Sequence, residues 1–200
     1  MESLPVNRRS ALRDFWGIAL FLILVLIGTL LINTFVFRSF NVLGPSMEPT
    51  LYTGDRLIVN RLPVTWAMLK SESYTPKRGE VIVFKNPHYN AGSSKEEYIV
   101  KRVIAFEGER VTVKNGVLTV YNGTNPAGFN VDATFEDPPG SPTSGTVDTT
   151  VSEGTLFVAG DHREDQFSYD SRNGLGLVPL YDVVGPVGLR VYPFTNVRLF

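Results

Sequence analysis

One uncharged apolar segment near the N-terminus constrains this chain more than any other feature. From Trp16 to Phe37 the sequence reads WGIALFLILVLIGTLLINTFVF, 22 residues without a charge. A helix of that length rises about 33 Å, enough to cross a hydrocarbon core of roughly 30 Å. A buried core helix of a soluble protein is a poorer interpretation, because the segment is hydrophobic on every face. We therefore predict one transmembrane helix over residues 16–37.

The flanks of this segment distinguish a permanent anchor from a cleaved secretory signal. A secretory signal usually has an apolar region of about 7–15 residues that ends in small residues. Here the segment is longer, ends in bulky side chains and is followed by Arg38. Arg8, Arg9 and Arg13 precede it, so the positive-inside rule places the N-terminus in the cytoplasm. We predict a cytoplasmic tail over residues 1–15 and an extracytoplasmic domain over residues 38–200.

Composition removes several classes of function. The 200 residues include no Cys and two His, which excludes disulfides, thiolate metal sites and a cysteine nucleophile and argues against a histidine-rich metal site. The formal net charge of −1 lacks the basic excess typical of nucleic-acid binders. We expect no metal, no cofactor and no nucleic-acid partner, and the sequence does not indicate an oligomeric state.

The sequence beyond the apolar segment predicts an all-β, mostly antiparallel domain. Short runs rich in β-branched and aromatic residues alternate with Gly and Pro, and Asn115-Gly116 is a strong hairpin signal. These runs cover 55–60, 80–84, 97–106, 110–113, 117–121, 155–159, 183–184 and 187–192. One short helix is expected near 65–70. The segment 122–153 is rich in Pro, Gly, Ser and Thr and is interpreted as loops, so a core of 38–110 and 155–200 would carry a small loop-rich insertion at about 111–154.

Three polar regions are candidates for chemistry, although each also has an ordinary structural interpretation. Ser46 lies in GPSMEPTL, where it would pass for a turn serine. Lys101 interrupts the apolar strand YIVKRVI and shares a strand face with Ile99 and Val103. Such a lysine either extends its amine to solvent or is desolvated, which lowers its pKa and makes the neutral amine available as a base. The polar block GDHREDQFSYDSR at residues 160–172 would pass for a solvated loop.

Together, GPSMEPTL, GDRLIVN, YIVKRVI and GDHREDQFSYDSR, in this order after a single anchor, resemble the bacterial type I signal peptidases. These are membrane-bound serine proteases that remove signal peptides from exported proteins. The resemblance implies a Ser/Lys dyad in which Ser46 is the nucleophile and Lys101 the general base. It also implies that Ser168 orients the lysine ammonium by a hydrogen bond. It further implies charged positions that support the site through ion pairs: Arg102, Asp161, Asp170 and Arg172.

The same resemblance implies how a substrate would be bound. The strand Phe40–Leu43 would pair with an extended signal peptide, and Phe40 would lie near the membrane lipid. Val42, Leu51 and Val100 would line shallow apolar pockets that select small residues at the first and third positions before the cut. The backbone N–H of Ser46 would be one oxyanion donor. Some relatives carry a serine where this chain has Gly44, which leaves the second donor open.

Three alternatives remain beside this interpretation. His162 replaces an asparagine of the family pattern and suggests a Ser–His–Asp triad with Ser46 and Asp161, but adjacent residues of an extended chain point to opposite sides. A specialised Ser/Lys peptidase, for pilin maturation or in an organellar inner membrane, would share the motifs. An inert membrane-tethered β module that binds peptides would not need the dyad. The resemblance favours a bacterial plasma-membrane protein with signal peptides as its partners.

Overall fold

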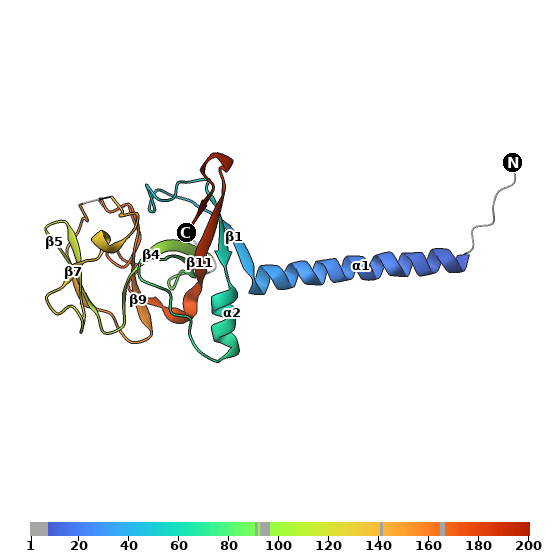
Figure 1. Cartoon of the computed structure of the whole chain (residues 1–200), viewed down its shortest axis with the longest axis horizontal. Helices are drawn as coiled ribbons and strands as arrows, with labels where there is room; N and C mark the ends of the chain where they lie inside the picture. The colour runs from blue at the N-terminus through green and yellow to red at the C-terminus, as the bar shows by residue number, and fades with distance from the viewer. Residues whose placement is uncertain (1–7, 91, 93–96, 141, 165–166) are drawn as a thin grey trace.

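The computed structural model describes residues 8–90, 92, 97–140, 142–164 and 167–200. Helix α1 (Arg8–Phe35) projects away from a compact β domain (Figure 1). Its segment Arg13–Phe35 contains an 18-residue window with a mean hydropathy of 2.8, and none of that window is buried against the domain. These features are those of a single-pass anchor. Part of the predicted cytoplasmic tail, residues 1–7, lies outside the described residues.

The predicted C-terminal end of the membrane helix, Phe37, is wrong by two residues. The helix ends at Phe35, and Phe37 opens strand β1 (Phe37–Asn41), where it pairs with Asn60 of β2 (Arg56–Asn60). Apolar composition continues unchanged across this boundary, so hydropathy does not detect it. The boundary is set by the ladder with β2, a tertiary contact that the local sequence does not specify.

The larger sheet confirms the predicted all-β, antiparallel architecture. Its strand order is β1-β2-β11-β3-β4-β9-β10, with β12 added beside β11. Every pairing in it is antiparallel. The further bounds are β3 (Val81–Lys85), β4 (Tyr98–Phe106), β9 (Thr155–Ala159), β10 (Val178–Pro179), β11 (Val183–Tyr192) and β12 (Arg198–Leu199).

The region predicted as a loop-rich insertion forms most of a second antiparallel sheet. Its order is β7-β6-β5-β8, from β5 (Arg110–Lys114), β6 (Val117–Tyr121), β7 (Phe129–Asn130) and β8 (Val147–Thr150). Strands β7 and β8 and a 3₁₀ turn at Asp132–Thr134 lie where only loops were expected. Both strands are short and polar in sequence, and their pairing with β6 and β5 defines them. Val111 and Val113 pack with Ile104 and Phe157 of the larger sheet, so the insertion shares its core with the main domain.

Helix α2 (Leu62–Leu69) begins three residues before the predicted position near Thr65. Pro63 lies in its first turn, where its missing N–H costs no hydrogen bond. Only Val64 of this helix is buried. Between α1 and α2, the chain forms the antiparallel pair β1–β2 with the Ser46 segment as its connection. A second apolar core lies beneath this pair and includes Met47, Leu51, Leu57 and Val59.

Candidate active site

Ser46 lies in the tight segment between β1 and β2. Gly44, at φ +82°, turns the chain in a conformation that favours glycine, and Glu48 N donates to Pro45 O at 3.0 Å. The next residue, Met47, is fully buried, and Leu51 N donates to Met47 O at 2.9 Å. Buried anchors on its C-terminal side thus fix the segment while Ser46 itself remains half-exposed.

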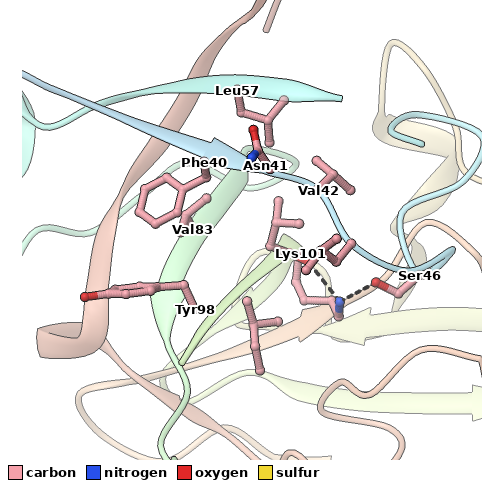
Figure 2. A pocket seen from close by; sticks show the side chains of 11 residues that line it. Phe40, Asn41, Val42, Ser46, Leu57, Val83, Tyr98 and Lys101 are labelled. Atoms are coloured by element: carbon pink, nitrogen blue, oxygen red, sulfur yellow. Dashed lines mark hydrogen bonds between the residues drawn. The ribbon is translucent and has the colours of Figure 1, made fainter. Parts of the chain in front are cut away.

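Lys101 of β4 points directly at the serine. Its Nζ donates hydrogen bonds to Ser46 Oγ at 2.7 Å and to Val100 O at 2.9 Å (Figure 2). The residue is only 3% exposed. Its strand neighbours Ile99 and Val103 are buried in an apolar cluster. Two residues 55 positions apart in the sequence therefore form a serine–amine pair whose amine is largely removed from water, while the serine is half-exposed.

Behind this pair, Arg102 and Asp161 form a buried ion pair. Arg102 Nε donates to Asp161 Oδ1 at 2.8 Å and Nη2 donates to Oδ2 at 2.5 Å, a bidentate geometry. Thr50 Oγ1 donates to the same carboxylate, and Asp161 is fully buried. The pair links β4 to the chain that follows β9 and, through Thr50, to the end of the Ser46 segment.

A second buried pair, Asp170 with Arg172, fixes the chain on the other side. Arg172 Nη2 donates to Asp170 Oδ2 at 2.7 Å, and both side chains are inaccessible to solvent. Asp170 Oδ2 also accepts from Gly160 N at 2.8 Å. The four predicted charged residues that would support the site thus form two ion pairs beside the segment that carries Ser46.

Gly160 is a site residue that the sequence interpretation did not single out. A Cβ at this position would lie 2.2 Å from Ser46 O, 2.2 Å from Ser168 Oγ and 2.9 Å from Ser168 Cβ. Two residues further on, His162 N donates to Ser46 O at 3.1 Å. The only sequence signal was the glycine at the end of an apolar strand, and many such glycines merely form turns.

Ser168 is fully buried, but it does not form the predicted hydrogen bond with Lys101. Among the described residues, its Oγ has no hydrogen-bond partner. The hydroxyl instead packs against Gly160, as the short distance from the Cβ position there shows. The backbone is held separately, because Asn173 Nδ2 donates to Ser168 O at 3.1 Å.

His162 is close to Ser46 without being its base. Its Nδ1 lies 3.3 Å from Pro45 O, and its ring stacks at 5.1 Å on that of Phe167. Asp161 is bound to Arg102 and Thr50 instead of orienting the imidazole. The geometry therefore argues against a Ser–His–Asp triad, as the sequence interpretation expected.

Two adjoining pockets flank Ser46. The first is lined by Phe40, Val42, Leu43 and Val100, all predicted to bind substrate, together with Leu57, Val83 and Tyr98 (Figure 2). The second is lined by Leu43, Gly44, Pro45, Asn86, Ile99, Phe167 and Tyr169, and both include Ser46 and Lys101. Leu51, also predicted to line a pocket, does not line either one; it is fully buried with Met47 beneath the site.

Two strand edges face the first pocket with their backbone unpaired by other strands. β1 is the end strand of its sheet, and its one neighbour is β2. In β4, residues 98–101 pair only with β3, because the ladder with β9 begins at Arg102. An extended peptide placed between β1 and β4 would find backbone donors and acceptors on both sides.

A family model and two relatives found by comparison with known proteins are all described as signal peptidases. The family model described as "Signal peptidase, peptidase S26" matches residues 14–192. Signal peptidase I P of Bacillus subtilis subsp. natto is 33% identical over 96% of this chain and 95% of its own length. Signal peptidase I T of Bacillus subtilis (strain 168) is 35% identical over 92% of this chain and 87% of its own.

A crystal structure of a signal peptidase I from Enterococcus faecalis V583 is 25% identical, with a TM-score of 0.38, and covers 56% of this chain and 96% of that one. The assignment does not depend on this superposition. It follows from the model match and from two relatives above 30% identity along almost the whole length. The chain therefore belongs to the signal peptidase family, peptidase S26, whose members are serine hydrolases.

Proposed function

We propose that this chain is a membrane-anchored endopeptidase that removes N-terminal signal peptides from exported preproteins with a Ser46/Lys101 dyad. The observation that supports this most is the 2.7 Å distance between Lys101 Nζ and Ser46 Oγ at a lysine that is 3% exposed. Burial disfavours the charged ammonium, and a neutral amine at that distance can accept the serine proton. No cofactor is needed for this chemistry.

The reaction follows from the two groups. Ser46 Oγ attacks the scissile carbonyl carbon while its proton passes to Lys101 Nζ. The backbone N–H of Ser46 donates to the oxyanion that forms, and the second donor is not assigned. The C–N bond then breaks as Lys101 returns the proton to the leaving amine, which leaves an ester on Ser46. Lys101 next takes a proton from water as that water attacks the ester. It returns the proton to Ser46 Oγ when the bond between Oγ and the acyl carbon breaks, which releases the signal peptide with a free carboxyl group and restores both groups.

The substrate is an extended peptide with small residues at the first and third positions before the cut. It adds as a strand between the outer edge of β1 and residues 98–101 of β4, which among the described strands pair only with β3. Alternate side chains of a strand point the same way, so two of them face the apolar lining near Phe40, Val42 and Val100. A pocket with these walls favours alanine-sized side chains over charged or large ones.

The dyad is tested with Ser46→Ala and Lys101→Met in the full chain, assayed on a preprotein whose signal peptide ends in alanine. Each variant loses activity by on the order of 10⁴-fold, as concerted catalytic groups do. Lys114→Met is the matched control, because the Lys114 side chain is 61% exposed in the second sheet. If Ser46→Ala retained wild-type cleavage, Ser46 would not be the nucleophile. If the wild-type chain itself cleaved no precursor, the chain would be an inert binding module instead.

A panel of precursors tests the substrate class. A general signal peptidase cleaves several unrelated alanine-ending signal peptides at similar rates. A specialised peptidase for pilin maturation, or one of an organellar inner membrane, leaves most of them intact. Failure on all ordinary signal peptides, with activity on one special precursor, would replace the main proposal by this second candidate.

We also propose a bacterial plasma-membrane location with the N-terminus in the cytoplasm. Arg8, Arg9 and Arg13 precede the span, and Arg38 alone follows closely. The chain has no cysteine, so Tyr181→Cys, at a position 81% exposed, introduces a single thiol into the β domain. In intact cells of a kind that has no outer membrane, a membrane-impermeant maleimide labels this thiol, because the β domain lies outside the plasma membrane. Labelling only after lysis would mean the opposite orientation.

A further inference from the structure

Helix α2 presents an apolar face that the described residues of the β domain leave exposed, with Lys70 Nζ 5.6 Å from the centre of the Trp66 ring. Leu62, Trp66 and Leu69 are spaced i, i+4 and i+7 and are 48%, 64% and 75% exposed. We call these three residues the α2 face. Val64, the one buried residue of the helix, lies on the opposite side. An exposed surface helix of a water-soluble domain normally carries polar residues here, so this face indicates a contact with an apolar medium.

The α2 face begins at the level where the membrane helix ends. Thr65 Oγ1 donates to Phe35 O, the last residue of α1, at 2.7 Å. Arg61 N donates to Val36 O at 2.8 Å. Figure 1 shows α2 running crosswise to α1 beside its C-terminal end. A short helix that lies across the axis of a membrane span, at the depth where the span stops, lies in the plane of the interface.

Two arginines at the same level have no acidic partner among the described residues. Arg38 lies over the ring of Tyr98 at 4.6 Å, and none of the described ion pairs includes Arg38 or Arg61. Arg61 Nε is buried without a hydrogen-bond partner. Burial, and then the like charge of Arg38, lower the pKa of Arg61. Two neighbouring guanidinium groups with unused donors favour an anion such as a phosphate.

We propose that α2 is a second membrane contact, in which the α2 face enters the leaflet at the C-terminal end of α1 and Arg38 and Arg61 bind phospholipid phosphates. The partner is the bilayer itself because the face is continuous with the span, and tryptophan is enriched at membrane interfaces. The contact fixes the tilt of the β domain relative to the membrane and holds the pockets beside Ser46 near the lipid. This inference depends on the anchor and is independent of the dyad.

The experiment uses the full chain, whose two tryptophans are Trp16 and Trp66. Trp16→Phe leaves Trp66 as the only tryptophan, and the protein is reconstituted in phosphatidylcholine/phosphatidylglycerol vesicles with or without acyl chains dibrominated at carbons 6 and 7. The α2 contact predicts that brominated lipid quenches most of the Trp66 emission. Trp66→Phe, which reports Trp16 in α1, is the positive control for insertion. Trp66 emission equal in both lipids would overturn the proposal.

Charge variants identify the groups that make the contact. In the Trp16→Phe background, Leu69→Glu reduces the quenching several-fold, whereas Val117→Glu, at the exposed first residue of β6 in the second sheet, leaves it unchanged. Arg61→Gln also weakens the quenching, and Arg110→Gln, again in the second sheet, does not. Unchanged quenching in Leu69→Glu would overturn insertion of the α2 face. Unchanged quenching in Arg61→Gln would overturn the phosphate contact.

Discussion

Gly160→Ala provides a sharp test of how the site is held in place. The glycine N–H is bound to Asp170, and its Cα faces the carbonyl of Ser46. An added Cβ would lie 2.2 Å from Ser46 O, whereas real Cβ contacts are essentially never under 3.0 Å. The backbone of the nucleophile segment or of Gly160 must therefore shift by about 0.8 Å, because no rotamer change moves a carbonyl oxygen.

The magnitude of the effect follows from that displacement. A misplacement of about 1 Å at reacting groups costs on the order of 10²-fold in rate. An extra methyl in a packed interior lowers the free energy of unfolding by about 1–3 kcal/mol. We therefore expect kcat to fall by about 10²-fold for Gly160→Ala, while the protein remains folded and binds its substrate.

The assay is cleavage of one preprotein in detergent, with kcat and KM measured separately, and thermal unfolding followed by circular dichroism. Gly123→Ala is the matched control, because a Cβ there meets nothing within 4 Å and the residue is exposed. It retains wild-type kcat. If folded Gly160→Ala retained kcat within about threefold of wild type, close packing of Gly160 against Ser46 would not position the nucleophile.

Three further predictions concern stability. Asp161→Ala leaves the Arg102 guanidinium buried without its counter-ion. We expect the free energy of unfolding, measured by denaturant titration, to fall by about 3–5 kcal/mol. A loss below about 1 kcal/mol would contradict this. Ser168→Ala leaves the unfolding midpoint unchanged, because the hydroxyl has no hydrogen-bond partner among the described residues, and a clear decrease would reveal one. Although burial opposes it, hydrogen bonds, chiefly from Arg78, lower the pKa of Glu109. Its stabilisation is therefore complete above the unfolded-state pKa and lost as pH falls through the lower folded-state value, so Glu109→Gln flattens the acid limb of the stability curve.

Prediction from sequence succeeded where local pattern and physics agree. The strand around Lys101 was recognised because β-branched residues surround it, and its shared face with Ile99 and Val103 followed from period-2 alternation. Alternation left open whether the amine is desolvated, and the fold buries the residue. Prediction failed where pairing with a distant strand, or packing in the core, decides the conformation or the exposure of a residue. Phe37 is equally apolar in a helix or a strand, and only its ladder with Asn60 places it in β1. Leu51 was assigned to a pocket wall because apolar residues suit both walls and cores, and the fold buries it completely.

Composition and short-range periodicity were enough to predict the long apolar N-terminal helix, the antiparallel β character of the domain and the absence of cysteine chemistry. The tertiary structure decided which of the polar residues meet. Ser46 and Lys101 are 55 residues apart and Arg102 and Asp161 are 59 apart, and each pair forms only when distant strands are in register. Within the part of the chain that the structure describes, the Ser168 hydroxyl without a hydrogen-bond partner and the exposed α2 face were also decided by tertiary packing.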